Sequence, residues 1–167
     1  MLIMKTLCVL LIVIGTISID AHLAEEEFPP AFFHLISKVR KHCLDSFPIS
    51  ETERENARMG NFDDNDTEMK KYVTCLFTKS GFTDKSLHMN KALLNAFIPK
   101  VLKEGNGVEM IIECSDKARE KLADHPFEDK VWDMLKCMYH GDPVLFSAFY
   151  PTLTYSTIRI VRRRRMF

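Results

Sequence analysis

The chain has 167 residues, with 23 basic and 23 acidic side chains. This length suits one domain with a substantial core and is short for two domains. Five arginines gather within 159–165; without them and without residues 1–21, the rest carries 17 basic and 22 acidic side chains, a net charge of −5. A mildly acidic body argues against nucleic acid as the main partner.

The N-terminus, "MLIMKTLCVLLIVIGTISIDAHLA", has the layout of a secretory signal peptide. A short basic start precedes an unbroken apolar run at 7–14, which is too short to span a bilayer. We expect residues 1–21 to be removed by cleavage after Ala21, with Ser18 and Ala24 as alternatives; a buried N-terminal helix is the competing interpretation. No later stretch is long and apolar enough for a membrane span, so we expect a secreted, extracellular protein.

The rest of the chain is predicted to be helical throughout, since its apolar residues recur with helical spacing and no useful alternating strand pattern appears. A first helix opens at residues 29–30 and extends to Cys43, with an apolar stripe on one face. Ser50 and Glu53 form a capping box that starts a short polar helix, and Gly60 ends that helix.

The segment 61–66, "NFDDND", is expected to be a loop. It is acidic, but it lacks the glycine and the distal glutamate of a calcium loop, so a solvated loop is the better interpretation. Asp66 or Thr67 then caps a third helix. A fourth helix follows around 93–101, and Pro99 inside it is expected to kink or break it.

A fifth helix is predicted over 108–122, after the sequence "EGNG" at 104–107. A sixth opens at Pro126, where proline is well tolerated, and ends at Gly141 and Pro143. Six helices without an internal repeat are therefore expected.

Four cysteines remain once Cys8 leaves with the signal peptide: Cys43, Cys75, Cys114 and Cys137. An even count in a small secreted chain indicates two disulfides, and spacing alone does not choose among the three possible pairings. A zinc site is disfavoured because it needs close ligand pairs such as C-x-x-C. The cysteines fall on the first, third, fifth and sixth helices, so the disulfides would tie helix to helix. A shell stapled in this way can leave its centre unfilled.

This cysteine layout resembles the insect odorant-binding proteins, the PBP/GOBP family. Chains of that family have a signal peptide, six helices and six cysteines, which pair first with third, second with fifth and fourth with sixth. The four cysteines match the first, third, fourth and sixth positions, whereas Lys71 and Glu128 stand at the second and fifth. That paired loss is the pattern of the minus-C subgroup. "CMYHGDPVLFSAF" also resembles the family's ending, and the resemblance covers roughly residues 25 to 150.

The resemblance implies an all-α, six-helix, disulfide-linked fold enclosing an apolar cavity within residues 22–150. Its disulfides would be Cys43–Cys75 and Cys114–Cys137. The implied function is a carrier of small hydrophobic, odorant- or pheromone-like ligands, with no cofactor, an odorant receptor as a further partner, and a monomer or weak homodimer as the assembly. The residues themselves also argue against an enzyme, because no G-x-S-x-G, H-E-x-x-H or phosphate-loop motif appears.

Nine methionines and twelve phenylalanines supply adaptable and large apolar surfaces. They suit a cavity for semi-volatile hydrophobic molecules, with ordinary core packing as the alternative for any one residue. The predicted ligand-binding residues come from the helices that surround the cavity in the family: Phe32, Ile36, Val73, Leu76, Met89, Leu93, Phe97, Met110, Ile111, Trp132 and Leu135.

Three further features of the sequence suggest an ion pair, a glycosylation site and a possible role for histidine. Lys71 and Glu128 would form an ion pair across the position of the absent bridge, or would be two unrelated surface charges. Asn65 begins the sole N-glycosylation sequon, Asn-Asp-Thr, which also fits a chance triplet. Histidine titrates near physiological pH, but no histidine is marked for a switch, and surface positions are expected for His34, His42, His88, His125 and His140.

The basic tail at 151–167 fits no part of the family pattern, and we expect it to be disordered. A processing site, a membrane-surface patch or a mistaken C-terminus are alternatives.

Two other function classes remain open. One is a non-olfactory carrier in haemolymph or gland secretion, and the other is a secreted interaction protein without a ligand cavity.

Overall fold

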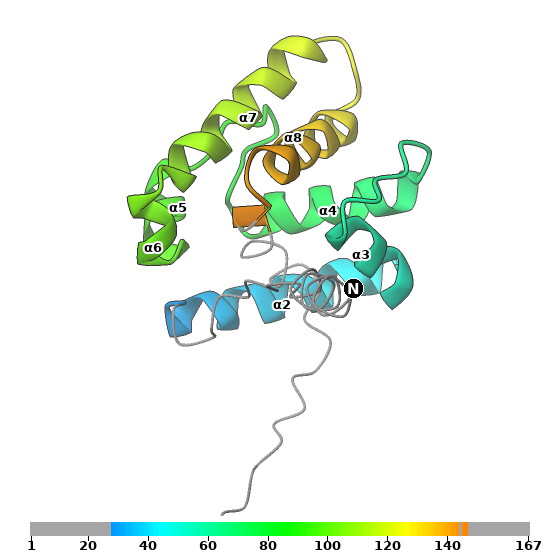
Figure 1. The fold of residues 1–167 in the computed structure, drawn as a ribbon. Helices are drawn as coiled ribbons and strands as arrows, with labels where there is room; N and C mark the ends of the chain where they lie inside the picture. Colours follow the sequence, from blue (N-terminus) through cyan, green and yellow to red (C-terminus); the bar gives the residue numbers. More distant parts are fainter. Residues whose placement is uncertain (1–27, 144, 147–167) are drawn as a thin grey trace, which may run out of the picture.

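The computed structural model describes residues 28–143 and 145–146, and the regular elements within them are all α-helices (Figure 1). The predicted signal peptide at 1–21 and the basic tail at 151–167 lie outside these residues. One isolated bridge between Thr83 and Met89 is the only β-pairing in the described part. In chain order the helices are α2 (Pro30–Ser46), α3 (Glu51–Arg58), α4 (Thr67–Lys79), α5 (Lys91–Phe97), α6 (Lys100–Glu104), α7 (Gly107–Lys121) and α8 (Phe127–Gly141).

The all-α prediction is confirmed, but the described residues hold seven helices where six were predicted. The difference arises at Pro99, which divides the predicted fourth helix into α5 and α6. Proline has no backbone N–H and disfavours the helical conformation of the residue before it. Ile98 accordingly adopts extended angles, φ −70° and ψ 134°.

The helix ends follow the local sequence closely. The Ser50 side chain accepts a hydrogen bond from the Glu53 N–H at 3.2 Å, and the Glu53 carboxylate accepts one from the Ser50 N–H at 2.7 Å. The predicted capping box is therefore confirmed. Of the two predicted caps for α4, the structure uses Asp66, whose side chain accepts from the Met69 N–H at 2.9 Å. After α3, Gly60 takes the left-handed conformation with φ 82°.

The helices pack in a chain of neighbours, with α4 against α2, α8 against α4 and α7 against α8, while α5 and α6 pack on α7 (Figure 1). Since α4 lies between α2 and α8, residues 72–77 are all buried, including both sides of the helix. An amphipathic helix at the surface of a domain buries only one apolar stripe. A helix enclosed by two neighbours instead buries most of its circumference.

The loop between α4 and α5 also contributes to the core. Leu87 is fully buried although its backbone is in the left-handed region, with φ 61°. The hydroxyl of Ser115, itself fully buried in α7, donates a hydrogen bond to the Leu87 carbonyl. Burial of a leucine side chain contributes about 1.5–3 kcal/mol, which offsets a left-handed backbone cost of about 1–2 kcal/mol.

Candidate ligand-binding site

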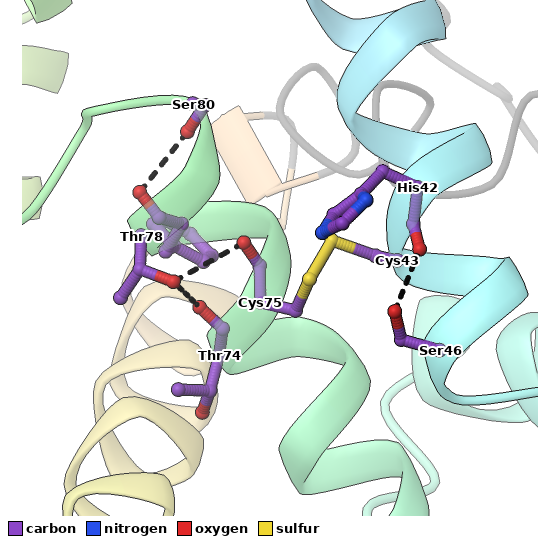
Figure 2. The surroundings of a disulfide bond; sticks show 8 residues. His42, Cys43, Ser46, Thr74, Cys75, Thr78 and Ser80 are labelled. Atoms are coloured by element: carbon purple, nitrogen blue, oxygen red, sulfur yellow. Dashed lines mark hydrogen bonds between the residues drawn. A yellow bond between two sulfur atoms is a disulfide. The ribbon is translucent and has the colours of Figure 1, made fainter.

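Two disulfides tie the helices in pairs. Cys43–Cys75 joins α2 to α4 with a Cα–Cα distance of 5.8 Å (Figure 2), and Cys114–Cys137 joins α7 to α8 with 5.6 Å. These are the two pairs that the resemblance implied. They close chain segments with sequence separations of 32 and 23 residues, so each contributes about 3–4 kcal/mol in the chain-entropy model.

The predicted ligand-binding residues lie together in one apolar cluster. Four of them are only partly buried at its edge, namely Met89, Leu93, Phe97 and Met110. The remaining seven are buried within it: Phe32, Ile36, Val73, Leu76, Ile111, Trp132 and Leu135. Helices α2, α4, α5, α7 and α8 and the loop before α5 therefore converge on a shared apolar interior. Contact of these residues with a ligand stays a prediction.

Ring contacts link the elements at one side of this cluster. Phe32 of α2 and Phe97 of α5 have ring centroids 5.7 Å apart, and Phe97 lies 6.2 Å from the ring of Phe82. Phe28, just before α2, stacks on Phe32 at 5.2 Å. Aromatic pairs at these distances add about 0.5–1.5 kcal/mol each beyond their buried area. Phe97 is the partly exposed member, so it lies where the interior of the cluster meets solvent.

A separate groove of about 340 Å³ lies on the surface beside the Cys43–Cys75 disulfide. It is lined by residues from the end of α2, from α4 and from the start of α8: His42, Ser46, Phe47, Lys71, Thr74, Cys75, Thr78, Lys79 and Glu128. No predicted ligand-binding residue lines it. Sequence reasoning missed this groove because polar and charged positions from three helices form it, and only the packing of those helices brings them together.

Two hydroxyl groups near this disulfide bond to carbonyls of their own helices, whereas the buried hydroxyl of Thr74 has no hydrogen-bond partner among the described residues. Ser46 donates to the His42 carbonyl at 3.0 Å, and Thr78 donates to the Thr74 carbonyl at 2.8 Å (Figure 2). The groove therefore combines polar and charged side chains with the apolar surface of Phe47 and Cys75, whereas the interior cluster is formed by hydrophobic residues.

Residues 25–141 match the family model of the PBP/GOBP family. The chain belongs to this family. No curated protein and no solved structure matches it. Proteins of the PBP/GOBP family are binding proteins for small hydrophobic ligands and not enzymes. Within the described residues, no helix has the length and apolar character needed to cross a membrane.

In this PBP/GOBP chain, the predicted ion pair between Lys71 and Glu128 is wrong. Lys71 instead pairs with Glu68 at 2.7 Å, one turn earlier in α4, and within the described residues it forms no ion pair with Glu128. The i, i+3 partner lies on the same exposed helix face and needs no precise placement of α8. Both partners are about half exposed, so their pairing adds little stability.

The polar connection between α4 and α8 forms one residue earlier on α4 and one residue later on α8. Lys70 and Asp129 make an ion pair at 2.6 Å, and their side chains are 12% and 30% exposed. Partial burial reduces screening by solvent, so this pair is stronger than the exposed pair of Lys71. It lies beside Lys71 and Glu128, the two residues that the sequence resemblance sets at the second and fifth cysteine positions.

The loop at 61–66 is fixed to α8 by two contacts. The Asp64 carboxylate accepts hydrogen bonds from the Trp132 indole N–H at 3.1 Å and from Lys136. The hydrogen bond from Lys136 holds the pKa of Asp64 below its ordinary value. The Phe62 ring packs edge-on against Trp132, with centroids 5.2 Å apart. Trp132, a predicted ligand-binding residue, therefore directs its polar edge to this loop.

A second polar group lies between α2, α3 and α4. Arg54 is buried and donates from its guanidinium to the Ile49 carbonyl at 2.6 Å. Burial raises the pKa of Tyr72, and the nearby charge of Arg40 opposes that shift. Burial also lowers the pKa of Arg40. Arg54 thus fixes the turn into α3, close to Arg40 of α2 and Tyr72 of α4.

Histidines do not form a site in the described residues. The five that were expected at the surface, namely His34, His42, His88, His125 and His140, are all exposed. His88 contacts Asp84 through Nδ1 at 3.2 Å, four residues away in the same loop. Among residues 28–143 and 145–146 there is no group of three or more His, Cys, Asp or Glu side chains arranged to hold a metal ion.

Proposed function

We propose that this protein is a secreted carrier of the minus-C subgroup, which binds and transports small hydrophobic ligands in an extracellular fluid. Residues 1–21 would act as the signal peptide and 22–150 as the binding domain. Odorant- or pheromone-like molecules are the proposed ligand class, in a fluid such as the lymph around chemosensory neurons. An odorant receptor is the proposed further partner.

The observation that carries this proposal is a continuous apolar cluster inside a PBP/GOBP chain whose helices are paired by two disulfides. The described cysteines are all used in these bridges, and the resemblance assigns Lys71 and Glu128 to the positions of a third bridge. Crosslinks provide part of the stability that dense packing otherwise supplies, so such a shell tolerates an internal ligand.

Binding would be driven by burial of apolar ligand surface. Each square ångström removed from water contributes about 25 cal/mol, reduced by the cost of ordering the ligand and the side chains. A shell with one bridge fewer opens more readily, so we propose a broad range of ligands. A panel of apolar compounds in which one compound alone binds tightly would contradict that breadth.

Displacement of a fluorescent apolar probe tests the proposal, with two phenylalanines as a matched pair. Phe97 is a predicted ligand contact, whereas Phe47 lines the surface groove, and both are partly buried. We expect the probe to bind the full protein and Phe97→Ala to weaken binding several-fold, while Phe47→Ala leaves it unchanged. Circular dichroism would establish that both variants keep their helices.

Two outcomes favour other functions. Absence of probe binding by the folded protein would support a secreted interaction protein without a cavity. Loss of binding in Phe47→Ala alone would move the site to the groove. A non-olfactory carrier in haemolymph or gland secretion shares the same binding chemistry, and the tissue of expression separates it from a carrier at chemosensory neurons.

A further inference from the structure

The loop before α4 contains a surface feature that ligand transport does not use. Asn65, Asp66 and Thr67 form an Asn-X-Thr sequon, and no other asparagine of the chain is followed two residues later by serine or threonine. Such a sequence is the acceptor for N-linked glycans in secreted proteins, provided that the asparagine is accessible.

The structure places the Asn65 side chain at the surface in a tight turn. Its backbone N–H donates to the Asp63 carboxylate at 2.8 Å, and its carbonyl accepts from the Thr67 N–H at 2.9 Å. The residue is exposed, and its side-chain amide makes no hydrogen bond with any other described residue. The turn therefore uses only the backbone of Asn65, and a substituent on the amide nitrogen breaks none of these contacts.

The neighbours of Asn65 are held on both sides. Asp64 accepts hydrogen bonds from Trp132 and Lys136 of α8, and Asp66 caps α4 through the Met69 N–H. The polar side chains on either side are thus occupied in fixing the loop. A bulky glycan at position 65 displaces no buried side chain and covers a surface that is already polar.

We propose that Asn65 carries an N-linked glycan. The reaction forms a bond between Nδ2 of Asn65 and C1 of the first sugar of a lipid-pyrophosphate-linked oligosaccharide. The C1–O bond to the pyrophosphate breaks, the lipid pyrophosphate leaves, and the amide nitrogen loses one proton. The transferase of the secretory pathway supplies the catalysis, so this inference rests on the secretion part of the proposed function.

Expression of the full chain in a eukaryotic secretory cell line tests the inference. We expect the protein in the medium to lose mass when it is treated with a peptide N-glycosidase. Asn65→Gln and Thr67→Ala abolish that mass loss entirely. Thr67→Ser keeps the sequon and the mass loss, as does Asn61→Gln, a substitution in the same loop outside the sequon.

The results separate this inference from secretion itself. Protein in the medium without any glycosidase-sensitive mass overturns the glycan and leaves secretion standing. A mass loss that persists in Asn65→Gln also overturns it. Full-length protein that stays inside the cells with residues 1–21 attached and no glycan overturns both the inference and the secretion on which it rests.

Discussion

A third disulfide placed between positions 71 and 128 tests whether this chain lacks one bridge of a six-cysteine pattern. Lys71 lies on α4 and Glu128 on the first turn of α8, and both line the groove beside Cys75. The adjacent residues Lys70 and Asp129 make an ion pair at 2.6 Å, so this part of α4 lies against the start of α8, and the variant Lys71→Cys/Glu128→Cys should close a bond there. No ion pair between the two residues is lost, because Lys71 pairs with Glu68.

The expected gain follows from the length of chain that the new bond closes. Positions 71 and 128 are 57 residues apart, and a loop of that size corresponds to about 4 kcal/mol in the chain-entropy model. Loss of the exposed pair between Lys71 and Glu68 costs about 0.2–0.5 kcal/mol. The free energy of unfolding should thus rise by about 3–4 kcal/mol, with strain in the bond as the main term that reduces it.

Denaturant unfolding of the oxidised variant, compared with the unchanged chain, measures this gain, and Lys71→Ser/Glu128→Ser gives the effect of the two replacements without the bond. Peptide mass mapping establishes that the native bridges are intact and that the new one has formed. A matched control places the cysteine at Lys79, which lines the same groove eight residues further along α4. Eight residues correspond to about 12 Å along a helix, so Lys79→Cys/Glu128→Cys should stay unbridged.

The minus-C interpretation would be refuted if the control pair formed a disulfide and the pair at positions 71 and 128 did not. If positions 71 and 128 stay reduced under oxidising conditions while positions 79 and 128 close, the second and fifth cysteines of the family have been assigned to the wrong residues. A 71–128 bond that forms but lowers the free energy of unfolding would show that the two helices do not present these positions at bonding distance.

Three further experiments test other contacts of the fold. A double-mutant cycle of Lys70→Ala and Asp129→Ala should give a coupling energy of about 1 kcal/mol that falls with added salt. Asp64 has a lowered pKa because a lysine donates to its carboxylate. The contribution of this carboxylate to the free energy of unfolding is complete above the pKa of an unfolded aspartate, about 3.9. It is lost as the pH falls through the lower pKa of the folded state. The stability difference from Asp64→Asn, followed by denaturant midpoints, should therefore shrink on acidification. Gly60→Ala should cost about 2–4 kcal/mol, since a Cβ there overlaps the Tyr139 ring and φ is 82°.

Each of these three experiments has a control or a result that would contradict it. Gly105 has an ordinary φ of −91°, and Gly105→Ala should leave the unfolding midpoint nearly unchanged; equal losses at both glycines would contradict the steric argument. A stability difference at Asp64 that grows on acidification would reverse the sign of the proposed linkage. A coupling of zero between Lys70 and Asp129 at low salt would show that partial burial does not strengthen their pair.

Much of the local structure could be predicted because a few adjacent residues decide it. The capping box at Ser50 and the break at Pro99 each depend on backbone groups within four residues. The cysteine positions carried the likeness to the PBP/GOBP family, because covalent partners must keep their places when surrounding side chains change. The apolar residues predicted for the ligand site lie in one cluster because their helical periodicity directs them inward.

Contacts between helices could not be predicted in this way. Whether Glu128 meets Lys71, or Asp129 meets Lys70, depends on a rotation of α8 by one residue, about 100° around its axis. The loop with Asp64 has no periodic pattern, so its attachment to Trp132 appears only when α8 is in place. The surface groove belongs to three helices at once and has no signal in any one of them.

The sequence by itself therefore determined the helical class, the ends of the helices and the cysteine positions that carry the likeness to its family. Tertiary structure alone decided which charges pair, which loop enters the core and where the surface is hollowed. The physical reason is the distance along the chain over which each kind of interaction acts. Caps, breaks and apolar stripes depend on neighbours along the chain, whereas ion pairs and grooves require separate helices to be positioned to within an ångström or two.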